Sequence, residues 1–214
     1  MKLSRKLRIT VGALICALLL PLCLISCSSE PPALEDVRDR FEQLIEASYE
    51  VNDIIFGEGL PTYDREGEQA EMIYYGFYGY DAYEIVTADC PYQSVEQIKA
   101  LAEQVYSPDY LEDIYTMAFD GYADENSENV TTARYLHTGD YLVKYAFGEK
   151  DSFNILLGKR IYKYDTMKIG ALSTAEAVNL EIETYLEGDE QNTYVETLRF
   201  VLVNDEWYLD EPTY

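Results

Sequence analysis

The chain has little histidine and little cysteine, the two side chains that carry much metal and nucleophile chemistry. It holds one histidine, His137, and four cysteines, of which Cys16, Cys23 and Cys27 fall within the first 27 residues. Cys90 is alone in the rest of the chain, which excludes an internal disulfide framework and a zinc site there. Cys90 has acidic neighbours, and nothing at local spacing from His137 forms a catalytic triad. We therefore expect no enzymatic activity, no metal and no cofactor.

Basic residues are also scarce. The chain has 16 lysines and arginines against 40 aspartates and glutamates, a net charge of −24 at pH 7. Such a surface repels nucleic acid and anionic head groups, and it favours cations or a protein partner with a basic surface. The simpler alternative is that self-repulsion keeps a monomer soluble. The acidic run at 120–128 lacks the glycine and glutamate placement of a calcium loop, so we interpret it as a solvated turn.

Only one long apolar run is present, from Val11 to Ile25, and it follows four basic residues. It is shorter than a typical membrane-spanning helix, and it is followed by the end of the motif LISC at 24–27. This pattern resembles the signal peptides of bacterial lipoproteins. The resemblance implies cleavage after residues 1–26 and a diacylglycerol or palmitate anchor on Cys27, which would hold the protein on the outer side of the cytoplasmic membrane. The alternatives are an ordinary signal peptide and a signal anchor.

After a short polar tether at 27–33, we expect a single α+β domain over residues 34–214. Its first element is a long helix, because apolar residues recur at three- and four-residue steps from Leu34 while charged residues fill the other face. The helix should end near Gly57.

Two further helices are predicted between residues 94 and 120. Ser94 and Gln97 have the spacing of a capping box, and the apolar residues that follow predict a helix over 95–106. Ser107 and Pro108 supply a cap and a first-turn proline for a third helix, which should end at a turn near Asp120.

The rest of the chain alternates with the period of β-strands. Within 178–187, apolar and polar residues alternate, which predicts a strand with one buried face and one solvent-exposed face. We therefore predict a curved antiparallel meander with the helices packed on it. The expected strands, separated by turn residues, are 134–138, 141–147, 160–170, 175–186, 193–203 and 206–209, after a hairpin at 72–87 that turns at 79–81.

Helices followed by a curled antiparallel sheet resemble the nuclear transport factor 2-like, or cystatin-like, cone. That resemblance implies a sheet wrapped around the first helix, with an open end that holds a ligand in many relatives, here near Trp207 and Tyr208. The sequence segments VYSPDYLEDIY, ARYL and WYLDEPTY resemble segments of exported, membrane-anchored proteins of Gram-positive bacteria. Over residues 72–214 the chain also resembles the DL-endopeptidase inhibitor family, which implies a protein that caps a cell-wall hydrolase.

Tyrosine is the residue type in excess, with 21 against seven phenylalanines and one tryptophan. Its ring and hydroxyl suit recognition surfaces that must stay soluble. An alternative is that many of these rings complete a core with wet edges. The densest cluster, our candidate partner-binding surface, mixes tyrosines with acids and comprises Tyr63, Tyr75, Tyr78, Tyr80, Glu66 and Asp81, with Tyr74 and Tyr83 nearby.

Two functions follow from these patterns. The first is a non-enzymatic, lipid-anchored envelope protein that binds a basic partner, for example a wall hydrolase, through its acidic tyrosine surface. The second is a carrier of a small molecule in the open end of the cone. Exposed aromatics on a convex hairpin would favour the first function, and aromatics inside a concavity would favour the second.

Overall fold

The structure, a computed structural model, describes residues 30–66, 73–74, 82–123, 131–146, 153, 156 and 158–214. The chain divides into two units, Met1–Glu30 and Pro31–Tyr214, and all but one of the described residues belong to the second. The predicted signal peptide and Cys27 lie outside the described residues. Among the residues that are described, no helix is long and apolar enough to cross a bilayer.

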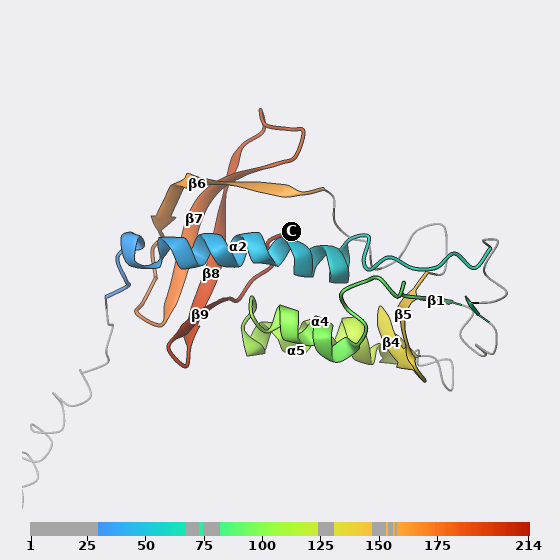
Figure 1. The fold of residues 1–214 in the computed structure, drawn as a ribbon. Coiled ribbons are helices and arrows are strands. Elements are labelled where there is room, and N and C mark those ends of the chain that lie inside the picture. The colour runs from blue at the N-terminus through green and yellow to red at the C-terminus, as the bar shows by residue number, and fades with distance from the viewer. Residues whose placement is uncertain are drawn as a thin grey trace, which may run out of the picture. The chain divides into compact units, whose positions relative to one another are not determined.

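The second unit has the predicted α+β class, with helices followed by antiparallel strands (Figure 1). Its elements are α2 (Leu34–Phe56), β1 (Tyr83–Ile85), α4 (Val95–Ala102), α5 (Pro108–Tyr115), a π-helix (Thr116–Asp120), β2 (Tyr122–Ala123), β3 (Thr131–Thr132), β4 (Tyr135–Thr138), β5 (Tyr141–Tyr145), β6 (Arg160–Ile169), β7 (Ala177–Leu186), β8 (Tyr194–Val203) and β9 (Glu206–Leu209).

The long first helix is confirmed, and it ends one residue before Gly57. Its predicted apolar stripe is buried from Val37 to Ile55 and forms the centre of the core. Phe41 is fully buried, and its ring stacks on that of Phe200 in β8 with the centroids 3.9 Å apart. The helix is therefore held on the sheet by close apolar packing.

The strands that α2 covers form the predicted meander, an antiparallel sheet in the order β6-β7-β8-β9. Val178, Leu180 and Ile182 on β7 are buried and alternate with more exposed residues, as the pattern predicts. Asn204 and Asp205 have positive φ angles of 51° and 66° in the two-residue turn between β8 and β9. Asn and Asp tolerate that conformation, so the turn sets the register of the last hairpin.

The second and third helices form, with one correction to their bounds. Ser94 and Gln97 make the predicted capping box. The helix ends at Ala102 rather than near 106, because the next residues join the edge of β9: Ser107 donates its N–H to the carbonyl of Leu209 at 2.7 Å, and Leu209 donates to Val105. Ser107 then caps α5, as predicted.

The strands expected at 134–138 and 141–147 do not join the meander. β4 and β5 form a separate sheet with β1, in the order β1-β5-β4. β5 already has a partner on each edge, so no edge is left for β6. The sheet has a small apolar cluster of its own, built on Tyr83, Ile85 and Val143.

The predicted hairpin at 72–87 is described only in part. Its second strand exists as β1, but β1 pairs with β5, and Thr62 rather than a preceding strand bridges to Val86. Ile73 and Tyr74 are not in a strand. The predicted turn at 79–81 lies outside the described residues.

The small sheet is attached to the end of α2 by polar groups. Arg134, which is fully buried, donates from Nε to the carbonyl oxygen of Ile54 at 2.9 Å and from Nη2 to that of Gly57 at 2.6 Å. The Tyr135 hydroxyl also donates to Ile54 and accepts from the N–H of Leu60. A cation at the negative end of a helix is electrostatically favourable, so this attachment also caps α2.

Candidate functional site

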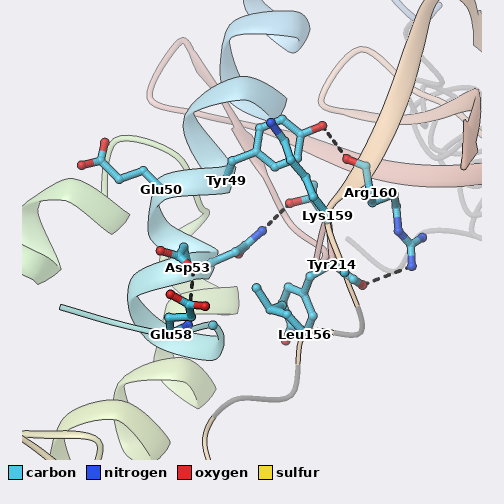
Figure 2. Close-up of a pocket in the computed structure, with 12 residues that line it drawn as sticks. Tyr49, Glu50, Asp53, Glu58, Leu156, Lys159, Arg160 and Tyr214 are labelled. Atoms are coloured by element: carbon cyan, nitrogen blue, oxygen red, sulfur yellow. Dashed lines mark hydrogen bonds between the residues drawn. The ribbon is translucent and has the colours of Figure 1, made fainter. Parts of the chain in front are cut away.

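A pocket of about 540 Å³ lies beside the last turns of α2 (Figure 2). Three segments that are far apart in the sequence build it: the end of α2 with the two residues after it, the residues that lead into β6, and residues 213–214. Its volume is in the range typical of small-ligand sites. The lining residues are Tyr49, Glu50, Asn52, Asp53, Gly57, Glu58, Leu156, Gly158, Lys159, Arg160, Thr213 and Tyr214.

A buried polar cluster supports the inner wall of the pocket. Asn52 donates from Nδ2 to the Thr213 hydroxyl at 2.7 Å and accepts from the Tyr106 hydroxyl at 2.7 Å. Ser48 shares a 2.6 Å hydrogen bond with the same Thr213 hydroxyl. The side chains of Asn52 and Thr213 are therefore fixed in place, and they hold the end of α2 against residues 213–214.

Aromatic rings give the pocket its apolar surface. The Tyr49 hydroxyl donates to the carbonyl oxygen of Arg160 at 2.7 Å, which ties α2 to the first residue of β6. Burial, reinforced by the charge of Glu46, raises the pKa of Tyr49 from 10.0 to about 12, so the hydroxyl remains a hydrogen-bond donor to a higher pH than an exposed tyrosine would. The Tyr214 ring packs on Phe56, with centroids 4.4 Å apart.

The charges of the pocket are divided between its walls. Asp53 and Glu58 stand at the end of α2, whereas Lys159 and Arg160 come from the strand side (Figure 2). Lys159 lies over the Tyr49 ring, with Nζ 4.5 Å from the centroid. Arg160 is engaged elsewhere, in an ion pair with Glu196. The pocket can therefore offer an acceptor region and a cation to one ligand.

The sequence-predicted surface is described at two of its six residues. Glu66 is exposed, and its backbone N–H donates to Asp64. Tyr63 is half-buried and integrated in the fold: its hydroxyl accepts from the N–H of Ala88, and its carbonyl accepts from the Tyr74 hydroxyl. Tyr63 therefore has a structural role. The other four predicted residues, Tyr75, Tyr78, Tyr80 and Asp81, lie outside the described residues.

Elsewhere, tyrosine and acid pair with each other. Burial together with the hydrogen bond from its hydroxyl to Glu50 raises the pKa of Tyr92 to about 12. These pairs place aromatic rings beside carboxylates on the surface, as the composition suggested. The tyrosine-to-glutamate hydrogen bonds include Tyr164 to Glu46 at 2.6 Å, Tyr92 to Glu50 at 2.6 Å, Tyr115 to Glu103 at 3.2 Å and Tyr208 to Glu206 at 3.0 Å.

The end of the sheet that carries Trp207 and Tyr208 offers less space than the pocket beside α2. Trp207 packs edge-on against Phe41 at 5.4 Å between centroids, and Tyr208 borders a cleft of about 260 Å³ with Tyr106 and Tyr115. The open end inferred from the resemblance is thus partly filled by Trp207, and the larger cavity lies beside α2.

The residues that sequence analysis singled out for chemistry are dispersed. His137 is exposed on β4, and Cys90 is buried with a free thiol. Within the described ranges, no group of three or more histidine, cysteine or acidic side chains is arranged to hold a metal ion. Residues 124–128 of the predicted acidic turn lie outside those ranges.

The pocket could not be predicted from the sequence, because no local pattern joins its three segments. One signal was present: the last turn of α2 contains Asp53 and no basic residue, although a helix C-terminus favours cations. No protein-family model matches the chain, and no curated protein matches it.

Proposed function

We propose that this protein is a non-enzymatic, lipid-anchored protein of the bacterial cell envelope that binds a small ligand in the pocket beside α2. The observation that carries the ligand function is the pocket itself, about 540 Å³ in volume, with aromatic, polar and charged groups on its walls. Two segments of its walls are held together by the polar cluster around Thr213, so the site is formed before any ligand arrives.

A variant that fills the pocket tests this function. Leu156 lines the pocket, so Leu156→Trp should occupy the ligand volume. Leu172 is 92% exposed and does not line it, so Leu172→Trp is the matched control. The purified full chain is dialysed against a metabolite extract, and bound compounds are identified by mass spectrometry. We expect wild type and the control to enrich the same compound, and Leu156→Trp to lose it. Equal enrichment by all three proteins would place binding elsewhere.

The proposed lipid anchor in the membrane rests on the sequence pattern at 24–27. Cells fed a labelled fatty acid should incorporate the label into the wild-type chain and not into Cys27→Ala. The variant should also remain unprocessed or leave the membrane fraction. Absence of label from the wild type would refute the lipid anchor.

A second function, recognition of a basic protein partner such as a cell-wall hydrolase, is favoured by the acidic face of α2. Asp39, Glu42 and Glu46 border an open groove there with Tyr164. This face resembles the candidate partner-binding surface in its chemistry, because both combine tyrosine with acidic residues. Carboxylates beside aromatic rings attract a basic surface and accelerate its association.

Substitutions at both places test the partner function. If a hydrolase is captured from the cell surface, Tyr75→Ala or Tyr78→Ala should weaken capture by about 1 kcal/mol or more if that ring is an anchor. Charge reversal at Glu42, Glu66 or Asp81 should mainly slow association and change its salt dependence. Capture unchanged by all of these variants, at wild-type thermal stability, would exclude both surfaces.

A further inference from the structure

The charged groups of the pocket beside α2 share one cavity without pairing. Lys159 has no carboxylate oxygen within 4 Å of its Nζ among the described residues, although Glu50, Asp53 and Glu58 line the same pocket. An ion pair between exposed groups gains little energy, so the free protein loses little by leaving these charges apart. Here the two groups stand apart across the space that a ligand would fill.

The three carboxylates of the acidic wall form no ion pair among the described residues. Asp53 lies in the last turn of α2, where the helix presents its negative end, and that turn has no basic residue. Glu58 follows at the same end, and the Glu50 carboxylate accepts from the Tyr92 hydroxyl at 2.6 Å. Arg134 and Lys144 place their cations on the main-chain oxygens of Ile54, Gly57 and Glu58, so the Asp53 carboxylate is the group left for a ligand ammonium.

The basic wall has one exposed cation. Arg160 donates from Nη1 to Glu196 and from Nη2 to the main-chain oxygen of Tyr214, and its buried Nε has no partner among the described residues. Lys159 is exposed and rests on the Tyr49 ring, which holds its ammonium group at the rim of the pocket. Lys159 is therefore the group best placed to pair with an anionic ligand.

We infer that this pocket binds a zwitterion that carries a primary ammonium and a carboxylate, either a free amino acid or a short peptide with free termini. The inference rests on the proposed ligand function of the same pocket. The ammonium group lies toward Asp53 and the end of α2, and the carboxylate lies toward Lys159. The apolar part of the ligand packs between them on Leu156 and the ring of Tyr214.

Other ligand classes fit the charges less well. A phosphate or other polyanion would face Glu50, Asp53 and Glu58, and a simple cation would face Lys159. A neutral sugar would leave both sets of charges unpaired and partly desolvated. Only a ligand with both signs, separated by an apolar segment, satisfies both walls.

The test compares ligands with free and blocked ends. The full chain in detergent is titrated calorimetrically with the standard L-amino acids and with dipeptides Ala-Xaa, each also as its N-acetyl and C-amide derivative. We expect free forms to bind and each blocked form to bind about tenfold more weakly, because each block removes one charge pair. Single amino acids and dipeptides distinguish the two sources of the zwitterion.

Substitutions assign each end of the ligand. Lys159→Met should weaken binding of the free ligand, and C-amidation of the ligand should then cause no further loss. Asp53→Asn should likewise weaken binding of the free ligand and remove the effect of N-acetylation. Lys168→Met, on the strand that Lys159 precedes, and Asp39→Asn, on the same helix as Asp53, change exposed residues outside the pocket and should bind as wild type does.

A neutral probe separates failure of this inference from failure of the pocket. Phenol is tested by ligand-observed NMR against wild type and Leu156→Trp. Free and blocked ligands that bind equally well would overturn the zwitterion. A second outcome would also overturn the zwitterion: phenol binds to wild type and not to Leu156→Trp, and no free zwitterion binds. In that case the proposed ligand function of the pocket would stand. If neither phenol nor any zwitterion binds, both the inference and the proposed ligand function fail.

Discussion

The meander and the small sheet β1-β5-β4 are held to α2 in different ways. The meander β6–β9 packs on α2 through apolar side chains, with Phe41 against Phe200 at the centre. The small sheet β1-β5-β4 contributes Tyr135 and Leu142 to the same core, and it is also attached at the end of α2 by hydrogen bonds from Arg134 and Tyr135 to backbone groups. Gly59 permits that attachment, because a Cβ there would lie 2.5 Å from Arg134 Nη2.

The difference separates bulk stability from local order. Apolar packing is non-directional and tolerates adjustment, whereas a buried guanidinium is stabilising only while every acceptor stays in place. We expect the meander to determine whether the chain folds, and the polar attachment to determine whether the small sheet stays docked.

The largest effect tests the apolar side. Phe41→Ala removes a fully buried ring and should lower the free energy of unfolding by about 4 kcal/mol. Val195 on β8 is 62% exposed, so Val195→Ala should cost under about 1 kcal/mol. Both values come from urea unfolding followed by circular dichroism. A similar cost for the two variants would mean that the contact of α2 with the meander does not dominate stability.

The next effect tests the polar side. Arg134→Met leaves the carbonyls of Ile54 and Gly57 without their charged donor and should cost about 3 kcal/mol. Arg199→Met breaks a half-exposed ion pair with Asp210 and should cost under about 1 kcal/mol. Hydrogen exchange sharpens the comparison: β4 and β5 should lose protection in Arg134→Met while β7 and β8 keep it. Uniform loss would show that the two sheets unfold together.

A smaller effect concerns alkaline pH. Burial raises the pKa of Tyr106 from 10.0 to about 12, so its stabilising contribution is complete below pH 10 and is lost as pH rises through about 12. A shift of this size corresponds to roughly 2–3 kcal/mol for a fully buried group. Tyr106→Phe should therefore show a shallower decline of unfolding free energy over that interval, measured as urea midpoints against pH. An equally steep decline would assign the effect to other tyrosines.

The smallest effect is a gain. Asp53→Asn removes a negative charge from the last turn of α2 and should raise the free energy of unfolding by about 0.5 kcal/mol at low salt. The amide oxygen can still accept from the N–H of Glu58, so the helix end keeps its hydrogen bond. Thermal melts at low and high salt check this, since screening should remove the gain. A loss of stability would mean that the carboxylate already has a stabilising cation.

The sequence predicted the elements whose patterns repeat. The stripe of α2, the alternation on β7 and the turn at Asn204 follow from helical period, strand period and turn chemistry. The sequence could not predict that Arg134 is buried, because an arginine beside a strand normally indicates an exposed edge. It could not reveal the pocket either, because Asn52 and Thr213 are 161 residues apart and nothing local connects them.

The Thr213 hydroxyl has a kinetic consequence. Its hydrogen bond with Ser48 joins groups separated by 165 residues, so it closes one of the longest loops in the chain. Loop closure over such distances is slow and follows the pairing of neighbouring strands. The contact of Phe41 with Phe200 spans a similar separation, so the pocket exists only in chains whose α2 has packed on the C-terminal strands, and a ligand that binds there stabilises only those chains.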